Sequence, residues 1–261
     1  MKPTERERHN PLAPVLVIVN ADDLGMSRQV NEAIFSLMER GRLTSASLLA
    51  NAPATDEAIQ RLSEFPHCSF GAHLNLTEYE PLSKAPGLKE LLDPSGRFQP
   101  LSGDFRFRLA TLRAMHTELK TQIEDLLTKG VALSHIDSHM NTHLRAPLFP
   151  VVKSLQQQYR IRIIRIKENL EPSRMQLKTR IKRSVYNWAM RRFSGSITVD
   201  AASELCTFID VASRQAPTYA TVEASAHPGN PYYPKDTELL LSPWEKKLCF
   251  PVRLASFHQL I

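Results

Sequence analysis

Residues 13–27 read APVLVIVNADDLGMS, and this stretch decides the fold. Val15–Val19 form an unbroken apolar run, as expected of a buried strand, and Asp22 and Asp23 follow at its end. Ser27 can then cap a helix, because a seryl oxygen accepts a hydrogen bond from the backbone of the first helical turn. The stretch therefore predicts a strand followed by a helix, with two adjacent acids between them.

Strand-like and helix-like runs alternate along the rest of the chain. Further strand-like runs lie at 43–51, 68–76, 132–137, 161–166 and 221–226. Helical spacing predicts helices near 54–62, 109–130, after Pro147, at 174–192, at 202–212 and near Trp244. Six or more such alternations predict an α/β protein with a parallel sheet, either closed as a barrel or open and doubly wound.

One domain is expected over residues 1–261, because 261 residues that are 42% hydrophobic can bury one large core. We expect 1–13 to be a flexible N-terminus. Residues 78–108 are rich in Pro, Gly and Ser, which predicts a long loop or lid with room for one short helix.

Composition also indicates the cellular location to expect. No run approaches the roughly 20 apolar residues that a membrane span needs, so we expect a soluble, cytoplasmic protein. Cys68, Cys206 and Cys249 lie far apart in the sequence, which argues against a disulfide framework and against a thiolate metal site. The sequence leaves a monomer and a homodimer both open.

The basic charge is concentrated in residues 174–192. This segment holds seven Lys and Arg residues and no acid, whereas the whole chain has a net charge of +6. Leu177, Ile181, Val185 and Trp188 recur there at helical spacing. The segment either contacts a membrane surface or an anionic glycan, or is a solvated outer face over the core. The second interpretation is favoured because exposed Lys and Arg are the default, and nucleic acid is not an expected partner.

Polar residues collect at the ends of the strand-like runs. In parallel α/β folds, residues that perform chemistry follow the C-terminal ends of strands, where the loops converge. Polar groups there cost desolvation free energy unless they are used. Four separated segments supply such residues: Asp22 with Asp23, His73, His135 with Asp137 and His139, and His227. We therefore expect one site at this end of the sheet.

The residue types indicate hydrolytic metal chemistry. Two adjacent carboxylates can take different roles if their surroundings separate their pKa values. Two imidazoles and one carboxylate can hold a divalent ion and leave positions open for water and substrate. The stretch HIDSHMNTH places His135, His139 and His143 four residues apart, and not all three need be ligands.

Four motifs together carry a family resemblance. NADDLGMS, GAHLNLT, HIDSHMNTH and EASAHPGN resemble, in order and spacing, the motifs of the YdjC-like carbohydrate deacetylases. This family includes chitooligosaccharide deacetylases and a branch associated with hopanoid biosynthesis. The resemblance runs from about Val15 to the end of the chain and implies a distorted (β/α) barrel.

The resemblance also implies roles for individual residues. By position, Asp23, His73 and His139 correspond to the metal ligands, Asp22 to the catalytic base and His227 to the general acid. The implied reaction is removal of an N-acetyl group from an amino sugar or N-acetylated oligosaccharide, with release of acetate. His227, protonated, would protonate the departing amine.

A metal ion and several substrate contacts complete the expected site. We expect one divalent ion, Mg or Zn, although Mn or Ni would suit the same nitrogen and oxygen ligands. Expected substrate contacts are Asn20, His143, Tyr232 and Tyr233, the two tyrosines because their rings could stack on a sugar face. Two departures, Leu24 in place of Phe and Asn141 in place of His, affect substrate fit more than chemistry.

Two other function classes stay open on the sequence. A metal-dependent phosphoesterase would use the same ligand types, although the chain has no glycine-rich phosphate loop. A non-enzymatic basic module would bind an anionic surface through 174–192, with its Asp and His residues only structural. Such a module would lose binding steeply with added salt.

Overall fold

The computed structural model describes residues 13–170 and 176–260. The predicted flexible N-terminus, 1–13, lies outside the described residues except for Ala13. Residues 171–175, which include the first two residues of the basic segment 174–192, lie outside them as well.

One parallel sheet forms the centre of the molecule. Its strands are β1 (Val15–Leu24), β2 (Ser45–Leu48), β3 (Ser69–Leu74), β4 (Leu133–Ser138), β5 (Ile163–Ile164), β6 (Ala201–Glu204), β7 (Thr221–Ala226) and β8 (Val252–Leu254). The order is β5-β4-β3-β2-β1-β7-β6, with β8 paired to the first part of β1. Since β1 has neighbours on both sides, its apolar run is buried, as the sequence predicts.

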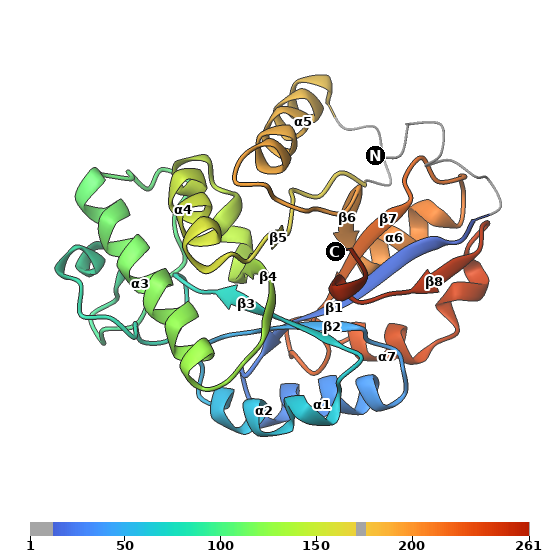
Figure 1. Ribbon diagram of the computed structural model, residues 1–261, viewed down its shortest axis with the longest axis horizontal. Coiled ribbons are helices and arrows are strands. Elements are labelled where there is room, and N and C mark those ends of the chain that lie inside the picture. The colour runs from blue at the N-terminus through green and yellow to red at the C-terminus, as the bar shows by residue number, and fades with distance from the viewer. Residues whose placement is uncertain (1–12, 171–175, 261) are drawn as a thin grey trace.

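Helices cover the outside of the curled sheet (Figure 1). They are α1 (Arg28–Glu39), α2 (Thr55–Arg61), α3 (Leu109–Thr128), α4 (Phe149–Tyr159), α5 (Leu177–Arg192), α6 (Leu205–Ala212) and α7 (Asp236–Leu241). Short 3-10 turns are η2 (Leu62–Glu64), η3 (Pro86–Leu91), η4 (His139–Leu144), η5 (Ala146–Leu148), η6 (Trp244–Lys247) and η7 (Phe257–Leu260). Within the described ranges, no helix is both long and apolar enough to cross a bilayer.

The sheet curls far enough to bring its two edges together. Ile164 N donates to Ile197 O at 3.2 Å, and Asn169 N donates to Ala202 O at 3.0 Å. The chain next to edge strand β5 thus contacts the chain around edge strand β6. The distorted (β/α) barrel expected from the sequence is confirmed as a curled, incompletely closed sheet.

Local sequence signals account for most elements. Ser27 Oγ accepts from Val30 N at 3.2 Å and caps α1, as expected. The expectation of a helix over 202–212 is wrong at its start, because 201–204 pair in register with β7 and the helix begins only at Leu205. The helix expected near Trp244 is a 3-10 turn, and neither α7 nor β8 was expected from the sequence.

The segment 78–108 is an irregular stretch with one short helix, η3, as expected. Leu88, Leu91, Phe98 and Leu101 are buried, and η3 packs on α3. The Glu118 carboxylate accepts from two backbone amides of the segment, at 3.0 and 2.7 Å. That the segment acts as a lid stays a prediction.

Helix α5 differs from the favoured interpretation of the basic segment. Leu177, Ile181, Val185 and Trp188 were expected to lie over the core, yet all four are exposed. In Figure 1 α5 stands apart from the helices that surround the sheet. The apolar stripe therefore faces away from the core, and that expectation is wrong.

Candidate active site

Strand register brings the predicted site residues together. Ala21 of β1 lies opposite Ala226 of β7, so Asp22 and His227 are neighbours at the next position. His73 of β3 lies opposite Asp137 of β4. A cavity of about 90 Å³ at this edge is lined by Asp22, Asp23, His73, Ser138, His139, Met140, Asn141, Glu168, Glu204, Ser225, His227 and Tyr233.

A backbone irregularity explains how two adjacent acids reach one cavity. Successive residues of a regular strand point to opposite faces. Between Ala21 and Leu24 the pairing of β1 with β2 shifts in register, and Asp23 has a φ of 66°, in the left-handed region. Bulges next to functional sites re-aim side chains in this way. Asp22 and Asp23 consequently both face the cavity.

Asp23, His73 and His139 form a compact group. Their ligand atoms lie within 4.8 Å of one another. Asp23 Oδ1 is 2.8 Å from His139 Nδ1 and 3.3 Å from His73 Nε2. One carboxylate and two imidazoles at these separations have the chemistry and spacing of a divalent-metal site. The three residues that the resemblance implied as ligands are the ones that the fold gathers.

Neighbouring groups orient this set. Asp137 Oδ1 lies 2.8 Å from His73 Nδ1, which leaves Nε2 directed toward Asp23. Asn230 Nδ2 donates to the second oxygen of Asp23 at 2.9 Å. Carboxylate partners of this kind fix the orientation of a ligating imidazole. Asp22, His73 and Asp137 also lie close together.

Arg165 fills the space between those carboxylates. Its guanidinium donates to both oxygens of Asp22 at 2.6 Å, lies 2.8 Å from Asp137, and donates to Glu223 at 2.6 Å. Burial alone would raise the pKa of Asp22, but Arg165 outweighs it, so the pKa lies below its usual value. Asp22 is therefore held ionised. Burial raises the pKa of Glu223 to about 7.

His227 faces Asp22 across the cavity. Its Nε2 is 3.8 Å from Asp22 Oδ2, its Nδ1 is 3.5 Å from Asp236, and its ring stacks on Tyr233 at 3.9 Å. Burial acts to lower the pKa of His227, but Asp236 and Asp22 reverse this and raise it above the usual value. The imidazole is therefore favoured in its protonated form.

The three histidines of HIDSHMNTH separate in space. Met140 and Asn141 both have left-handed backbones, so the chain turns after β4 rather than forming an α-helix. Of the three, only His139 lines the cavity. His135 packs on the Phe257 ring at 4.1 Å, and burial lowers its pKa to about 4.

The four expected substrate contacts fall in different places. Asn20 is fully buried and donates to Asp22 Oδ1 at 2.8 Å. His143 is buried beside Ser138, with Nε2 3.2 Å from Arg165 O. Tyr233 lines the cavity, whereas Tyr232 is 86% exposed. Asn20 and His143 thus support neighbouring residues, and Tyr233 is placed to meet a ligand.

Sequence reasoning missed several groups of the site, including Arg165, Glu223, Asn230 and Glu78. Glu78 Oε2 is 3.2 Å from His139 Nε2. Arg165 stands in the strand-like run IRIIRI, where an inward arginine needs buried carboxylates, and Glu223 stands in the buried run TVEASA. The sequence signal that could have revealed them was the presence of two opposite charges, Arg165 and Glu223, each inside an apolar strand-like run.

Comparison with known proteins identifies the family. Residues 16–247 match the family described as YdjC-like protein. A carbohydrate deacetylase of Halalkalibacterium halodurans is 37% identical over 145 residues, which are 55% of this chain and 60% of that protein. A carbohydrate deacetylase of Clostridium beijerinckii is 34% identical over 176 residues, 67% of this chain and 70% of that protein. The match thus spans about three fifths of the first relative.

A solved structure supports the fold. An Enterococcus faecalis V583 protein named for cellobiose-phosphate cleavage aligns with a TM-score of 0.74 and 23% identity. The alignment covers 95% of this chain and 99% of that one. The family match runs over most of the sequence and contains every residue that lines the cavity. The chain therefore belongs to the YdjC-like protein family.

Proposed function

We propose that this protein is a metal-dependent carbohydrate N-deacetylase that hydrolyses the N-acetyl group of an amino sugar and releases acetate. One observation carries the proposal: Asp22 Oδ2 and His227 Nε2 face each other at 3.8 Å beside the Asp23–His73–His139 group, with the pKa of Asp22 lowered and that of His227 raised. Hydrolysis of an amide needs such a base and such an acid at once. The names of the curated relatives support this activity.

Asp23, His73 and His139 would hold one divalent ion. The ion would lower the pKa of a bound water and polarise the acetyl carbonyl. Mg and Zn are the first candidates, and Mn and Ni suit the same donors. The orienting contacts of Asp137 and Asn230 support the assignment, because they hold His73 and Asp23 in place.

The proton transfers follow from the shifted pKa values of Asp22 and His227. As water adds to the acetyl carbon, Asp22 takes one of its protons. When the carbon–nitrogen bond breaks, His227 gives its proton to the departing nitrogen, because an amine leaves poorly without one. The products are acetate and the free amino sugar. Arg165 holds Asp22 in position throughout by its two hydrogen bonds.

The cavity is small for a whole sugar. Ligand pockets usually exceed roughly 300 Å³, whereas this one has about 90 Å³. We infer that the N-acetyl group enters while most of the sugar lies outside, against Tyr233 and nearer to Tyr232. Asn20 and His143 then act as supports for Asp22 and Ser138 rather than as substrate contacts.

We propose that the protein is located in the reducing cytoplasm. Cys68, Cys206 and Cys249 are all free thiols in the structure. Unpaired cysteines are usual in reducing compartments.

Acetate release from a panel of N-acetylated amino sugars, oligomers and lipid-linked glycans tests the proposal. We expect release by metal-loaded wild type and a fall in kcat of about 10² to 10⁴ for Asp22→Asn. Glu57→Gln, an exposed acid on α2, is the matched control and should keep full activity.

The outcomes separate the alternatives. Acetate release that Asp22→Asn leaves unchanged would remove Asp22 as the base. Release of phosphate from phosphate esters, with no acetate from any panel member, would establish the phosphoesterase instead.

A further inference from the structure

Helix α5 has an apolar stripe that no described part of the chain covers. Leu177, Ile181, Val185 and Trp188, here called the outer stripe, are 61, 54, 59 and 60% exposed. Their spacing places them on one face of the helix. A helix on a soluble protein normally turns such a face to the core. Helix α5 therefore turns its apolar face away from the core.

Polar contacts on the inner side fix this orientation. Asn187 is buried and forms two hydrogen bonds with the backbone of Lys167, at 3.0 and 2.9 Å. The Tyr186 hydroxyl donates to a backbone carbonyl of η4 at 3.2 Å, and the Lys153 ammonium donates to Met190 O at 2.7 Å. These contacts hold the outer stripe outward, because rotating the helix inward would leave buried polar groups unpaired.

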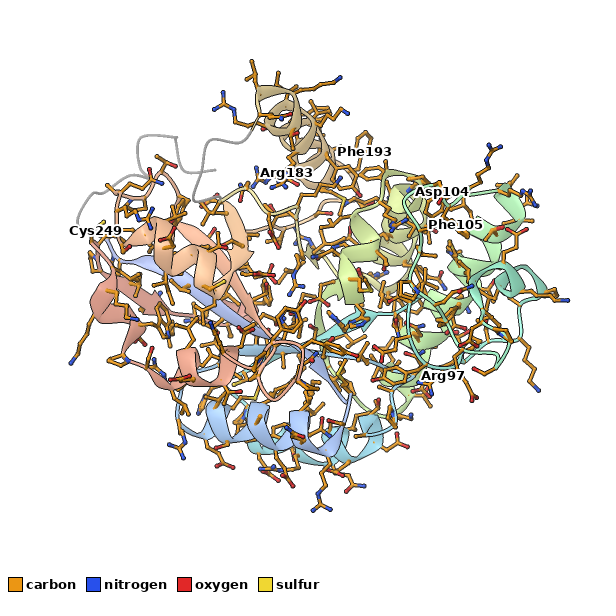
Figure 2. All side chains as sticks on the ribbon, turned by 180° about the vertical axis from the view of Figure 1, so that it is seen from behind. Arg97, Asp104, Phe105, Arg183, Phe193 and Cys249 are labelled. Carbon is orange, nitrogen blue, oxygen red and sulfur yellow. The ribbon has the colours of Figure 1, made fainter. Side chains whose placement is uncertain are left out.

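Basic residues border the outer stripe. By helical spacing, Lys178 and Lys182 lie on one flank and Arg180 lies on the other. No acid occurs between 176 and 192. In Figure 2 α5 projects from the molecule, with Arg183 and Phe193 on the side nearer to the body. The outward surface therefore combines apolar side chains with positive charge alone.

We propose that α5 docks on an anionic lipid bilayer, with the outer stripe in the interface and the flanking Lys and Arg against the headgroups. Apolar residues that include Trp, beside Lys and Arg, are the features of helices that lie in a membrane surface. The helix of 16 residues is about 24 Å long and lies along the surface rather than across it. A second copy is a poorer occupant, since its α5 would bring the same positive charges into contact.

The position of α5 relates this surface to the cavity. A groove of about 460 Å³ is lined by residues of α5, among them Thr179 and Lys182, and by Asn141 and Glu168. Asn141 and Glu168 also line the active-site cavity. Docking of α5 would thus hold the cavity mouth close to the bilayer. The docking itself does not depend on the proposed reaction.

Two readouts with vesicles test the docking. The full chain is mixed at low salt with vesicles of phosphatidylcholine alone or with about one third phosphatidylglycerol. We expect co-sedimentation with the anionic vesicles and at least about tenfold weaker binding to the neutral ones. Of the two tryptophans, Trp188 is 60% exposed and Trp244 is fully buried, so a blue shift of emission reports insertion of Trp188. Trp188→Phe should bind and show no shift.

Variants distinguish the electrostatic contribution to binding from the contribution of apolar side chains that insert into the bilayer. Lys178→Gln with Lys182→Gln should weaken binding about 25-fold, since each cation near an anionic surface is worth about fivefold. Ile181→Ser with Val185→Ser should weaken it at least about tenfold, because less apolar surface is buried. Asp22→Asn should bind like the wild type, which keeps this test apart from that of the deacetylase.

Four results would overturn the proposal. The first is no binding to anionic vesicles. The second is binding that is abolished by added salt and produces no blue shift, which would mean that α5 contacts the headgroups by charge alone. The third is self-association without lipid that shields Trp188, which would make a second copy the occupant. Loss of binding in Asp22→Asn would move the lipid contact to the cavity and would also contradict it.

Discussion

The C-terminal edge of the sheet and helix α5 depart from the usual distribution of side chains in opposite directions. The edge buries charge: Asp22, Asp23, Asp137, Arg165 and Glu223 are each at most 5% exposed. Helix α5 exposes apolar surface, with every residue of the outer stripe at least 54% exposed. Soluble proteins usually do the reverse in both cases.

The difference lies in where each region finds its partners. At the edge, arginine, histidine and asparagine side chains of the same chain pair with the carboxylates. On α5, no residue in the described ranges covers the outer stripe. The buried carboxylates of the first region thus have partners within the chain, whereas the outer stripe has no covering partner among the described residues. Substitutions should therefore affect folding at the edge and binding at the helix.

The largest effect is expected from Arg165→Met compared with Arg180→Met. Removing Arg165 leaves three buried carboxylates without their cation, which typically costs about 3 to 5 kcal/mol. Arg180 is exposed on α5, so its loss should change the free energy of unfolding by less than about 0.5 kcal/mol. Urea unfolding of both variants measures the difference. Equal stabilities would show that the buried pairs contribute nothing to the fold.

The next effect concerns pH. His135 is fully buried with its pKa lowered to about 4, so between pH 4 and pH 6.5 this residue is protonated in the unfolded chain and neutral in the folded one. The contribution of His135 to stability therefore falls as the pH falls through this window, by roughly 3 kcal/mol. His135→Gln should make the loss smaller by about that amount, while the exposed His258→Gln should not change it. Unfolding curves between pH 4 and 7 measure both, and parallel profiles would contradict the prediction.

Much of the edge could be predicted from the sequence. Strand-end positions identified Asp22, Asp23, His73, His139 and His227, because parallel strands bring their C-terminal ends to one place. The family resemblance, now confirmed, supplied their roles as expectations. Arg165 was missed because an arginine in a short apolar run does not reveal its partners, which come from β1, β4 and β7.

The errors have a physical pattern. Apolar periodicity predicted a helix over 174–192, and the structure has one over Leu177–Arg192. The direction of its apolar side was not predictable, because tertiary polar contacts of Asn187 and Tyr186 decide it. Residues 202–204 were expected to be helical, yet pairing with β7 makes them part of a strand. Tertiary context outweighs local propensity in both places.

A smaller effect is expected from Asp236→Asn. Asp236 is one cause of the raised pKa of His227, and its backbone-amide contact at 2.8 Å also positions the loop. Losing the charge lowers the pKa of His227, so the acid is protonated over a narrower range. The alkaline limb of the kcat/KM profile should move to lower pH, and kcat should fall by up to about tenfold, less than for loss of a general acid. An unmoved alkaline limb would assign that limb to another group.

The smallest effect on the free energy of unfolding is expected in the outer stripe, and it is compared with a substitution in the core. Trp188→Gln should change the free energy of unfolding by less than about 0.5 kcal/mol, because the side chain is already 60% exposed. Trp244→Ala, at a fully buried position against Phe208, should cost about 3 to 5 kcal/mol. Thermal and urea unfolding at several protein concentrations measure both. A large loss for Trp188→Gln would mean that the stripe is covered in the free protein, and α5 would then be a packed helix with no face left for a membrane.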